Sequence, residues 1–262
     1  MQKTICVIGG DARQQAAARA LRRAGYTVLG PEGAGKAAYL LLPMPSDAVT
    51  PELAAVFAAA RPGALALGGR VGPDVQAAAR AAGLELEDYF RRPELASLNA
   101  VPTAEGCMCL LMQLRDRTLW QSPILVLGYG RVGRAVARRL AALGAWVTVA
   151  ARSPEQRANA RCAGCRAAAL DQLPRLLPGF DAVVNTIPAP VLTRTELACL
   201  PAGALVIDLA SSPGGTDVAA AKDLGVRTEH ALSLPARCAP QTSGELVADT
   251  VLTILQERGK LP

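Results

Sequence analysis

One stretch constrains the fold of this chain more than any other. At residues 124–134, four apolar residues lead directly into the glycine pattern G-x-G-x-x-G. The apolar run predicts a buried parallel strand, and the apolar stripe after it predicts a helix that ends at Gly144. A second strand is expected at residues 146–150, where a strand–helix–strand unit requires one. The stretch therefore predicts a dinucleotide-binding turn, against the alternative that the glycines serve packing alone.

Each glycine of such a turn has its own physical role. Gly128 permits the tight turn, Gly130 lets a pyrophosphate approach the backbone, and Gly133 lets the helix lie close to the strand. The start of the helix then attracts the anion. The cofactor-binding residues predicted here are Gly128, Tyr129, Gly130, Arg131, Val132 and Gly133.

The end of the second strand indicates which dinucleotide binds. NAD enzymes place Asp or Glu there for the ribose 2′-hydroxyl, whereas this chain has Ala151, Arg152 and Ser153. Arg152 can pair with a 2′-phosphate, and Ser153 can hydrogen-bond to it. Alternatively, Arg152 is a solvated surface side chain, and Ser153 caps a helix from Pro154 with Gln156 completing a capping box. We predict NADP as the cofactor.

Composition limits the class of protein and its partners. The 262 residues are 51% hydrophobic and 19% charged, which describes a globular protein large enough for two modest domains. The net charge of +6 suits small anions, but the basic residues are scattered and only 3% of residues are aromatic, so no nucleic acid is expected. Because no apolar run approaches membrane-spanning length and the first residues lead straight into a strand, we expect no membrane, no signal peptide and a cytoplasmic location.

The chain has seven cysteines, an odd number that suggests reduced thiols. Cys162 and Cys165 have the spacing of metal ligands, but no second Cys pair or His pair accompanies them. We therefore interpret them as small residues at a helix end and predict no metal site.

Strands alternate with helices in both halves, which predicts an α/β fold. We expect two doubly wound parallel-sheet domains, the second a Rossmann dinucleotide-binding domain, bridged by interdomain helices. The first is an N-terminal substrate and partner domain, residues 1–100, with the C-terminal helix 241–258 packing back on it; the NADP-binding domain is residues 101–240. The first domain also opens with a strand, two glycines and a helix, but Asp11 at that helix start would repel a phosphate.

The expected elements can be given as ranges. In the first domain they are strands at 4–8, 26–29, 38–42, 64–67 and 84–86, and helices after Asp11, after Thr50 and at 73–82. In the second they are a helix at 107–114, strands at 165–168, 181–187, 204–210 and 226–229, and helices from 154, at 170–177, from a Thr193 capping box and at 217–224. A capping box at Thr242–Glu245 is expected to open the last helix.

Ligands of open parallel sheets lie beyond the carboxyl ends of the strands, so the loops there matter most. Two helices, opening near Pro102–Thr103 and at Thr242–Gly244, are expected to aim free amides at the same cleft and bind carboxylates; simple capping is the alternative. From these loops and helix starts we predict further cofactor contacts at Thr186, Ile187, Pro188 and Leu209, and substrate contacts at Asn99, Thr103, Ser211, Ser212, Thr242 and Ser243.

Three residues are candidates for catalysis: Glu105, His230 and Ser211. His230 begins a loop that follows a strand at the carboxyl edge of the sheet, where ligands bind. The sequence shows no companion residue that would fix its tautomer. Glu105 is a better-placed catalytic group if its helix lines the cleft; otherwise it is a first-turn residue that interacts with the helix dipole. Ser211 lies in the loop after the strand that contains Asp208.

Several of these segments together resemble a known family, the A subunit of dipicolinate synthase from spore-forming bacteria. The similar segments are residues 99–106, 128–133 with 151–153, 185–188, 208–217 and 239–244. The resemblance implies an oligomeric oxidoreductase that binds NADP and oxidises a dihydrodipicolinate-type cyclic dicarboxylate to dipicolinate during sporulation. It also implies the flavoprotein-like B subunit of dipicolinate synthase as partner. Because the product is aromatic, much of the driving force lies in the substrate, which would explain the missing catalytic dyad.

Two alternatives stay open. A two-domain 2-hydroxy-acid or alanine dehydrogenase has the same architecture, but a hydroxy-acid dehydrogenase would need an arginine after Asp208, where this chain has Ser211, Ser212 and Pro213. A non-catalytic NADP-sensing module is the other alternative, and the extra α/β domain counts against it.

Overall fold

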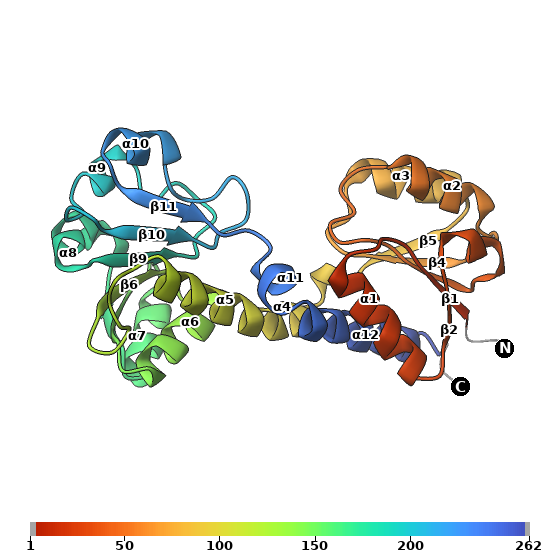
Figure 1. Cartoon of the computed structure of the whole chain (residues 1–262), viewed down its shortest axis with the longest axis horizontal. Coiled ribbons are helices and arrows are strands. Elements are labelled where there is room, and N and C mark those ends of the chain that lie inside the picture. Colours follow the sequence, from red (N-terminus) through yellow and green to blue (C-terminus); the bar gives the residue numbers. More distant parts are fainter. Residues whose placement is uncertain (1–3, 260–262) are drawn as a thin grey trace. The chain divides into compact units, whose positions relative to one another are not determined.

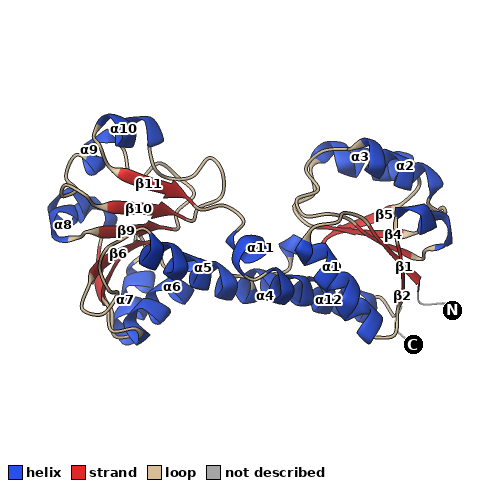
Figure 2. Ribbon diagram, viewed as in Figure 1, coloured by secondary structure: helices blue, strands red, loops and turns tan. Residues whose placement is uncertain are grey.

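The computed structural model describes residues 4–259, which fall into two compact α/β units. Unit 1 consists of Met1–Asn99 and Ala239–Pro262, and unit 2 of Ala100–Cys238 (Figure 1). Each unit holds its own parallel sheet with helices beside it (Figure 2). The predicted fold class, two parallel-sheet α/β domains, is confirmed.

Unit 1 has a five-stranded parallel sheet of order β2-β1-β3-β4-β5. The order reverses between β1 and β3, which is the switch point at which flavodoxin-like sheets bind ligands. The elements are β1 (Thr4–Val7), α1 (Ala12–Arg23), β2 (Thr27–Leu29), the 3-10 helix η1 (Pro31–Lys36), β3 (Tyr39–Leu41), α2 (Pro51–Ala59), β4 (Leu65–Gly68), α3 (Pro73–Ala81), β5 (Glu85–Asp88), η2 (Tyr89–Arg91), α4 (Pro93–Leu98) and α12 (Pro240–Glu257).

The central strands β1, β3 and β4 are buried on both faces, as their apolar runs predict, whereas the edge strands β2 and β5 are partly exposed. Ile5, Leu41 and Leu65 pack with α1 and α12 on one face. Cys6 and Leu40 belong to a second cluster with the residues of α2 and α3. Helix α12 thus packs on the sheet of the unit that begins the chain.

The start of α12 differs from the prediction. The helix begins at Pro240, so Thr242 lies inside it and the expected capping box is wrong. The amide of Ser243 already donates to the carbonyl of Ala239 at 2.9 Å. A Cβ on Gly244 would overlap the carbonyl oxygen of Arg13 in α1, so this small residue is explained by close helix packing.

Unit 2 has a six-stranded parallel sheet of order β11-β10-β9-β6-β7-β8, the Rossmann order. The order reverses between β6 and β9. The elements are α5 (Ala100–Gln113), β6 (Pro123–Leu127), α6 (Arg131–Ala142), β7 (Trp146–Ala150), α7 (Pro154–Cys162), β8 (Arg166–Ala168), η3 (Leu170–Gln172), α8 (Leu173–Leu176), η4 (Leu177–Gly179), β9 (Ala182–Asn185), α9 (Arg194–Leu197), β10 (Leu205–Asp208), α10 (Val218–Asp223), β11 (Arg227–His230) and α11 (Leu234–Cys238).

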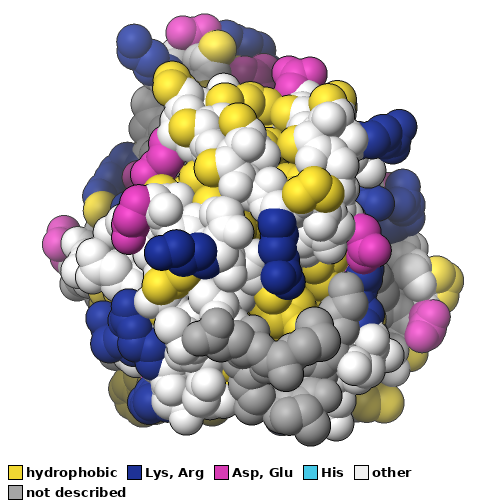
Figure 3. Space-filling model, turned by 90° about the vertical axis from the view of Figure 1, so that its right-hand side faces the viewer, with side chains coloured by type: hydrophobic (Ala, Val, Ile, Leu, Met, Phe, Trp, Pro, Cys, Tyr) yellow, Lys and Arg dark blue, Asp and Glu magenta, His cyan; other side chains and the backbone are white. Residues whose placement is uncertain are grey.

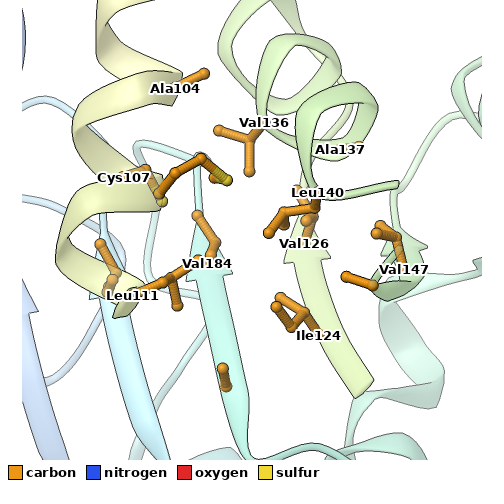
Figure 4. Packing of buried hydrophobic residues seen from close by; sticks show 14 of the residues in the cluster. Ala104, Cys107, Leu111, Ile124, Val126, Val136, Ala137, Leu140, Val147 and Val184 are labelled. Atoms are coloured by element: carbon orange, nitrogen blue, oxygen red, sulfur yellow. The ribbon is translucent and has the colours of Figure 1, made fainter. Parts of the chain in front are cut away.

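Helix α5 supplies much of the core of unit 2. Cys107 and Leu111 of α5 pack with Val136 and Leu140 of α6 and with Val126 of β6 (Figure 4). The other face of the sheet carries residues of α8, α9 and α10. Burial raises the pKa of the Cys107 thiol, which is a core side chain.

Three local predictions need correction. Helix α5 starts at Ala100 rather than near Thr103, with Pro102 in its first turn, where a missing amide costs nothing. The expected helix at 170–177 is a series of short turns, because Pro174 and Pro178 interrupt it. The helices α4 and α11 and the 3-10 helices η1 and η2 were not expected from the sequence.

The stretch Pro93–Gln113 is long and apolar enough to cross a membrane by length and composition alone. Its most apolar window is 44% buried inside the structure, and Cys107 and Leu111 are fully buried in the core of unit 2. The part of this stretch that lies in α5 therefore contributes to the core of unit 2.

Candidate functional site

The glycine turn of unit 2 has the geometry that its three roles require. Gly128 has a φ of +88°, and a Cβ there would lie 2.7 Å from the hydroxyl of Thr186. A Cβ on Gly133 would overlap the carbonyl oxygen of Gly128. Around Gly130, by contrast, no heavy atom of the described chain lies within 4 Å of a built Cβ. The turn is therefore closed on the protein side and open at Gly130, before the start of α6.

Two neighbours hold the turn in place. The Thr186 hydroxyl donates to the carbonyl of Leu127 at 2.7 Å and so joins the ends of β9 and β6. The Tyr129 side chain is buried beneath the Arg134 guanidinium, which lies 5.6 Å from the ring centroid. Burial is also the main reason that the pKa of Tyr129 is raised. Tyr129 can thus contribute its backbone to a ligand, while its ring belongs to the core.

The end of β7 presents a cationic loop. Arg152 is exposed, and the structure gives its side chain no ion pair within residues 4–259. Ser153 accepts from the amide of Gln156 at 3.4 Å as the cap of α7, while the reciprocal contact of a capping box is not formed. Arg157 donates to the carbonyls of Ala151 and Arg152 at 2.9 and 2.7 Å. Arg157, which no sequence pattern pointed to, holds this loop in place and adds a second positive charge.

A buried polar network at the ends of β9 and β10 was also missed. Asp208 is 4% exposed, and its carboxylate accepts from the Asn185 amide at 2.9 Å. It accepts as well from the amides of Ala210 at 3.0 Å and Gly215 at 2.8 Å and from the Thr216 hydroxyl at 2.8 Å. The network fixes both ends of the loop that carries Ser211 and Ser212. A polar residue closing an apolar strand was the available sequence signal.

Asn185 orders the neighbouring loop in the same way. Its amide donates to the carbonyl of Ile187 at 3.1 Å, and the amide of Ile187 donates back to its side-chain oxygen at 3.0 Å. Ile187 is half-buried, and Pro188 is exposed beside it. Ile187, a predicted cofactor contact, is therefore held beside Gly128 of the glycine turn.

His230 has a companion that the sequence did not reveal. Its Nε2 lies 3.0 Å from the carbonyl oxygen of Ala210. Because a carbonyl only accepts, Nε2 carries the proton and Nδ1 is left as the acceptor of the neutral ring. His230 also pairs with Asp208 in the register of β10 and β11, which places it beside the buried network.

The other two catalytic candidates lie in different surroundings. Glu105 is in the second turn of α5, so it is not a first-turn residue, and its carboxylate lies 3.6 Å from Arg139 of α6. Its side chain is 60% exposed. Ser211 is exposed in the loop after β10, where its carbonyl accepts from the amide of Gly214 at 2.8 Å.

The predicted substrate residues fall in both units. Ser211, Ser212 and Thr103 belong to unit 2, and Asn99, Thr242 and Ser243 to unit 1. Thr103 and Ser243 lie inside helices, so neither stands at a free helix start as predicted. Asn99 ends α4, where its amide donates to the carbonyl of Leu95 at 2.8 Å. Their contact with a substrate stays a prediction.

No metal centre is evident within residues 4–259, which contain no cluster of three or more His, Cys, Asp or Glu with suitable geometry. Cys162 ends α7 and is exposed, whereas Cys165 is buried.

On the face in Figure 3, Lys and Arg side chains stand apart between Asp and Glu and form no continuous basic patch.

The residues present fit a dinucleotide. The open Gly130 offers the close backbone approach that a pyrophosphate needs, and α6 has no acidic residue in its first turn. Arg152 and Ser153 would face a ribose phosphate, and Thr186–Pro188 with Leu209 would border the nicotinamide end.

Comparisons with known proteins also indicate an NADP-binding domain. The model of the saccharopine dehydrogenase NADP binding domain family matches residues 124–247, which include the glycine turn and the following strands. The A subunit of dipicolinate synthase from Bacillus subtilis (strain 168) is 38% identical over 173 residues, which is 66% of this chain and 58% of that protein. The aligned part thus spans less than two thirds of that relative.

Two crystal structures extend the similarity over nearly the whole chain. The dipicolinate synthase A subunit from Bacillus halodurans superposes with a TM-score of 0.88 and 30% identity, covering 97% of each chain. Its counterpart from Bacillus subtilis superposes with a TM-score of 0.86 and 29% identity, covering 98% of this chain and 97% of that one. On this evidence, the chain belongs to the family of dipicolinate synthase A subunits and contains an NADP-binding dehydrogenase domain.

Proposed function

We propose that this chain is an NADP-dependent oxidoreductase subunit that forms dipicolinate from a dihydrodipicolinate-type cyclic dicarboxylate during sporulation. The observation that carries the proposal is the glycine turn, which is open only at Gly130, in a chain of this family. We further propose that it works in the cytoplasm in a hetero-oligomer with the flavoprotein-like B subunit of dipicolinate synthase.

The residues of unit 2 divide the work of binding. The amides around Gly130 and at the start of α6 would hold the pyrophosphate. Arg152 and Ser153 would hold a 2′-phosphate, with Arg157 fixing the loop that carries them. Bound NADP supplies the hydride acceptor.

The reaction removes a hydride and a proton from the substrate ring, so the protein must align one ring hydrogen and accept one proton. Of the three catalytic candidates, the contacts favour His230, because its Nε2–H is fixed on Ala210 and Nδ1 is left to accept a proton. Glu105 is already paired with Arg139 on an exposed face. Ser211 would position a substrate carboxylate together with Ser212.

The test of the reaction is an assay with the purified chain, alone and co-purified with its flavoprotein-like partner. We expect NADP-dependent formation of the ultraviolet-absorbing pyridine product. Turnover of 2-hydroxy acids or of alanine instead would favour the alternative dehydrogenase. Tight NADP binding without turnover of any of these substrates, even with the partner present, would favour the sensing module.

The test of the cofactor is calorimetry on Arg152→Ala with NADP and NAD. A charge-assisted contact to phosphate contributes about 1.5–3 kcal/mol, so NADP affinity should fall about ten- to hundredfold while NAD affinity stays almost unchanged. Arg161→Ala, at the other end of α7, is the matched control and should change neither. Equal losses for the two nucleotides on Arg152→Ala would show that Arg152 does not select NADP.

A further inference from the structure

A second cluster of polar groups lies at the carboxyl edge of the other sheet, within unit 1. Three buried side-chain atoms there have no hydrogen-bond partner in the described chain: Nε of Arg13, Oε1 of Gln14 and the hydroxyl of Tyr89. The Arg13 side chain is only 7% exposed, and Gln14 and Tyr89 are fully buried. Buried polar atoms are almost always satisfied, so three together require an explanation.

The cluster is located at the switch point of the sheet. The side-chain amide of Gln14 donates to the carbonyl of Ile8 at 2.9 Å and to that of Leu42 at 2.8 Å, and so joins the ends of β1 and β3. Arg13 donates to the carbonyl of Met44, two residues after Leu42. A ligand of an open α/β sheet is expected at this position.

Tyr89, in η2 after the edge strand β5, packs in the same hydrophobic cluster as α1. A Cβ on Gly69 would lie 2.7 Å from the Tyr89 ring carbon that bears the hydroxyl and 2.6 Å from the Met44 sulfur. Burial raises the pKa of the Tyr89 hydroxyl, and the Arg13 charge opposes that shift, so the two groups are electrostatically coupled. Arg13 of α1 and Tyr89 of η2, which are 76 positions apart, thus both lie beside Met44 in the loop after β3.

The charge of Arg13 is only weakly matched within the described residues. Its one ion-pair partner is Asp11 at 3.9 Å, beyond hydrogen-bond distance. The Asp11 carboxylate already accepts from the backbone amide of Gln14 at 2.8 Å as the cap of α1. A buried guanidinium with so little compensation is costly, and an anion would lower that cost.

The unpartnered atoms also define the ligand. Arg13 Nε and the Tyr89 hydroxyl can donate to a carboxylate, whereas Gln14 Oε1 can only accept. A phosphate dianion is disfavoured, because Asp11 stands at the same helix start. We infer that Arg13, Tyr89 and Gln14 form a site in unit 1 for a small carboxylate that carries an N–H or O–H donor on a neighbouring atom.

The site needs a path of entry, since its atoms are shielded from solvent. Gly9, in the loop after β1, lies beside Gln14, and Gly69, in the loop after β4, lies beside Tyr89 and Met44. Entry requires these loops to part. A cyclic dicarboxylate with a ring nitrogen that carries hydrogen meets the requirement, so the identity of the natural ligand rests on the proposed function, whereas the site itself does not.

The test is calorimetry on the full chain with two probes, L-pipecolate, which has a ring N–H beside its carboxylate, and cyclohexanecarboxylate, which lacks it. Wild type should bind L-pipecolate more tightly. Arg13→Met should weaken that binding about ten- to hundredfold, and Tyr89→Phe about three- to tenfold. Arg22→Met, an exposed position at the other end of α1, is the matched control and should stay within twofold, and NADP affinity should be unchanged in every variant.

Each outcome has a clear meaning. Unchanged L-pipecolate binding in Arg13→Met and Tyr89→Phe, or no binding to wild type, would overturn the site and leave buried water as the explanation for the cluster. Equal affinity for both probes would overturn the role of Gln14. If Arg13→Met fails to fold, Tyr89→Phe decides, because it keeps the ring that packs on Gly69. Arg13-dependent binding without formation of dipicolinate would keep the site and reject the proposed function. Formation of dipicolinate without Arg13-dependent binding would keep the proposed function and reject the site.

Discussion

The two sheets begin alike, with a strand, glycines and a helix, but their first helical turns differ. In unit 2, the residue that caps α6 is Gly130, which has open space around it and no side chain that could accept from the first amides. In unit 1, Asp11 accepts from the Gln14 amide, and the Gln14 side chain bridges the ends of β1 and β3. Topology alone therefore does not make a phosphate site. The residue at the helix start decides whether free amides remain for an external anion.

Both edges also use a carboxylate after a strand to hold a loop, at different depths. Asp208 is 4% exposed and accepts from two amides, a hydroxyl and the Asn185 side chain. Asp88 accepts from the amides of Arg70, Val71 and Phe90 at 2.9–3.1 Å, with its side chain 13% exposed. The same device is thus less shielded from solvent in unit 1.

The largest effect should come from the glycine turn itself. Gly133→Val would push a side chain into the Gly128 carbonyl, so we expect a loss of about 2–4 kcal/mol in the stability of unit 2 and loss of detectable NADP binding. Gly130→Ala enters open space and should leave stability within about 0.5 kcal/mol while still weakening NADP. Urea unfolding followed by tryptophan fluorescence measures unit 2, since both tryptophans, Trp120 and Trp146, lie in it. Equal stability losses for the two variants would contradict the separate roles of the glycines.

A middle-sized effect is expected for the two carboxylates. Asp208→Asn would replace one carboxylate oxygen by an NH2 group, while the Gly215 amide and the Thr216 hydroxyl still need an acceptor. We expect this to lower the stability of unit 2 by about 1.5–3 kcal/mol. Asp88→Asn, at a more exposed position, should cost about 1 kcal/mol in unit 1. Hydrogen exchange in the loops at 209–216 and 69–72 reports each change locally. A larger loss at Asp88 would reverse this comparison.

The smallest effect should come from the helix caps. Asp11→Ala removes an acceptor 2.8 Å from the Gln14 amide and should cost about 1 kcal/mol, while Asp11→Asn should retain most of that. Ser153→Ala, with a longer bond of 3.4 Å to Gln156, should cost less than Asp11→Ala. Thermal unfolding and exchange of the first-turn amides measure both. Asp11→Ala should gain no NADP affinity, because Gln14 still fills the edge; a gain would show that the cap charge alone excludes the phosphate.

Local patterns predicted much of this molecule. The glycine turn and the Thr193 capping box depend on backbone conformation within a few residues, and both form as the spacing predicts. Where two local signals competed, the prediction at α12 was wrong. Thr242–Glu245 has the pattern of a capping box, but the helix starts at Pro240, and Gly244 packs on α1. The start at Pro240 agrees with the preference of proline for the first helical position, and Gly244 is explained by close packing on α1.

The sequence by itself determined two parallel sheets and the position of the glycine turn, because strand and helix periodicity and the freedom of glycine to adopt positive φ are properties of short segments. Only the tertiary structure decided that Asp208 gathers Asn185, Gly215 and Thr216, or that His230 meets Ala210. The same holds for Arg13 and Tyr89. Each of these contacts joins loops that meet only when strands distant in the chain take neighbouring places in a sheet, and no short-range pattern encodes that order.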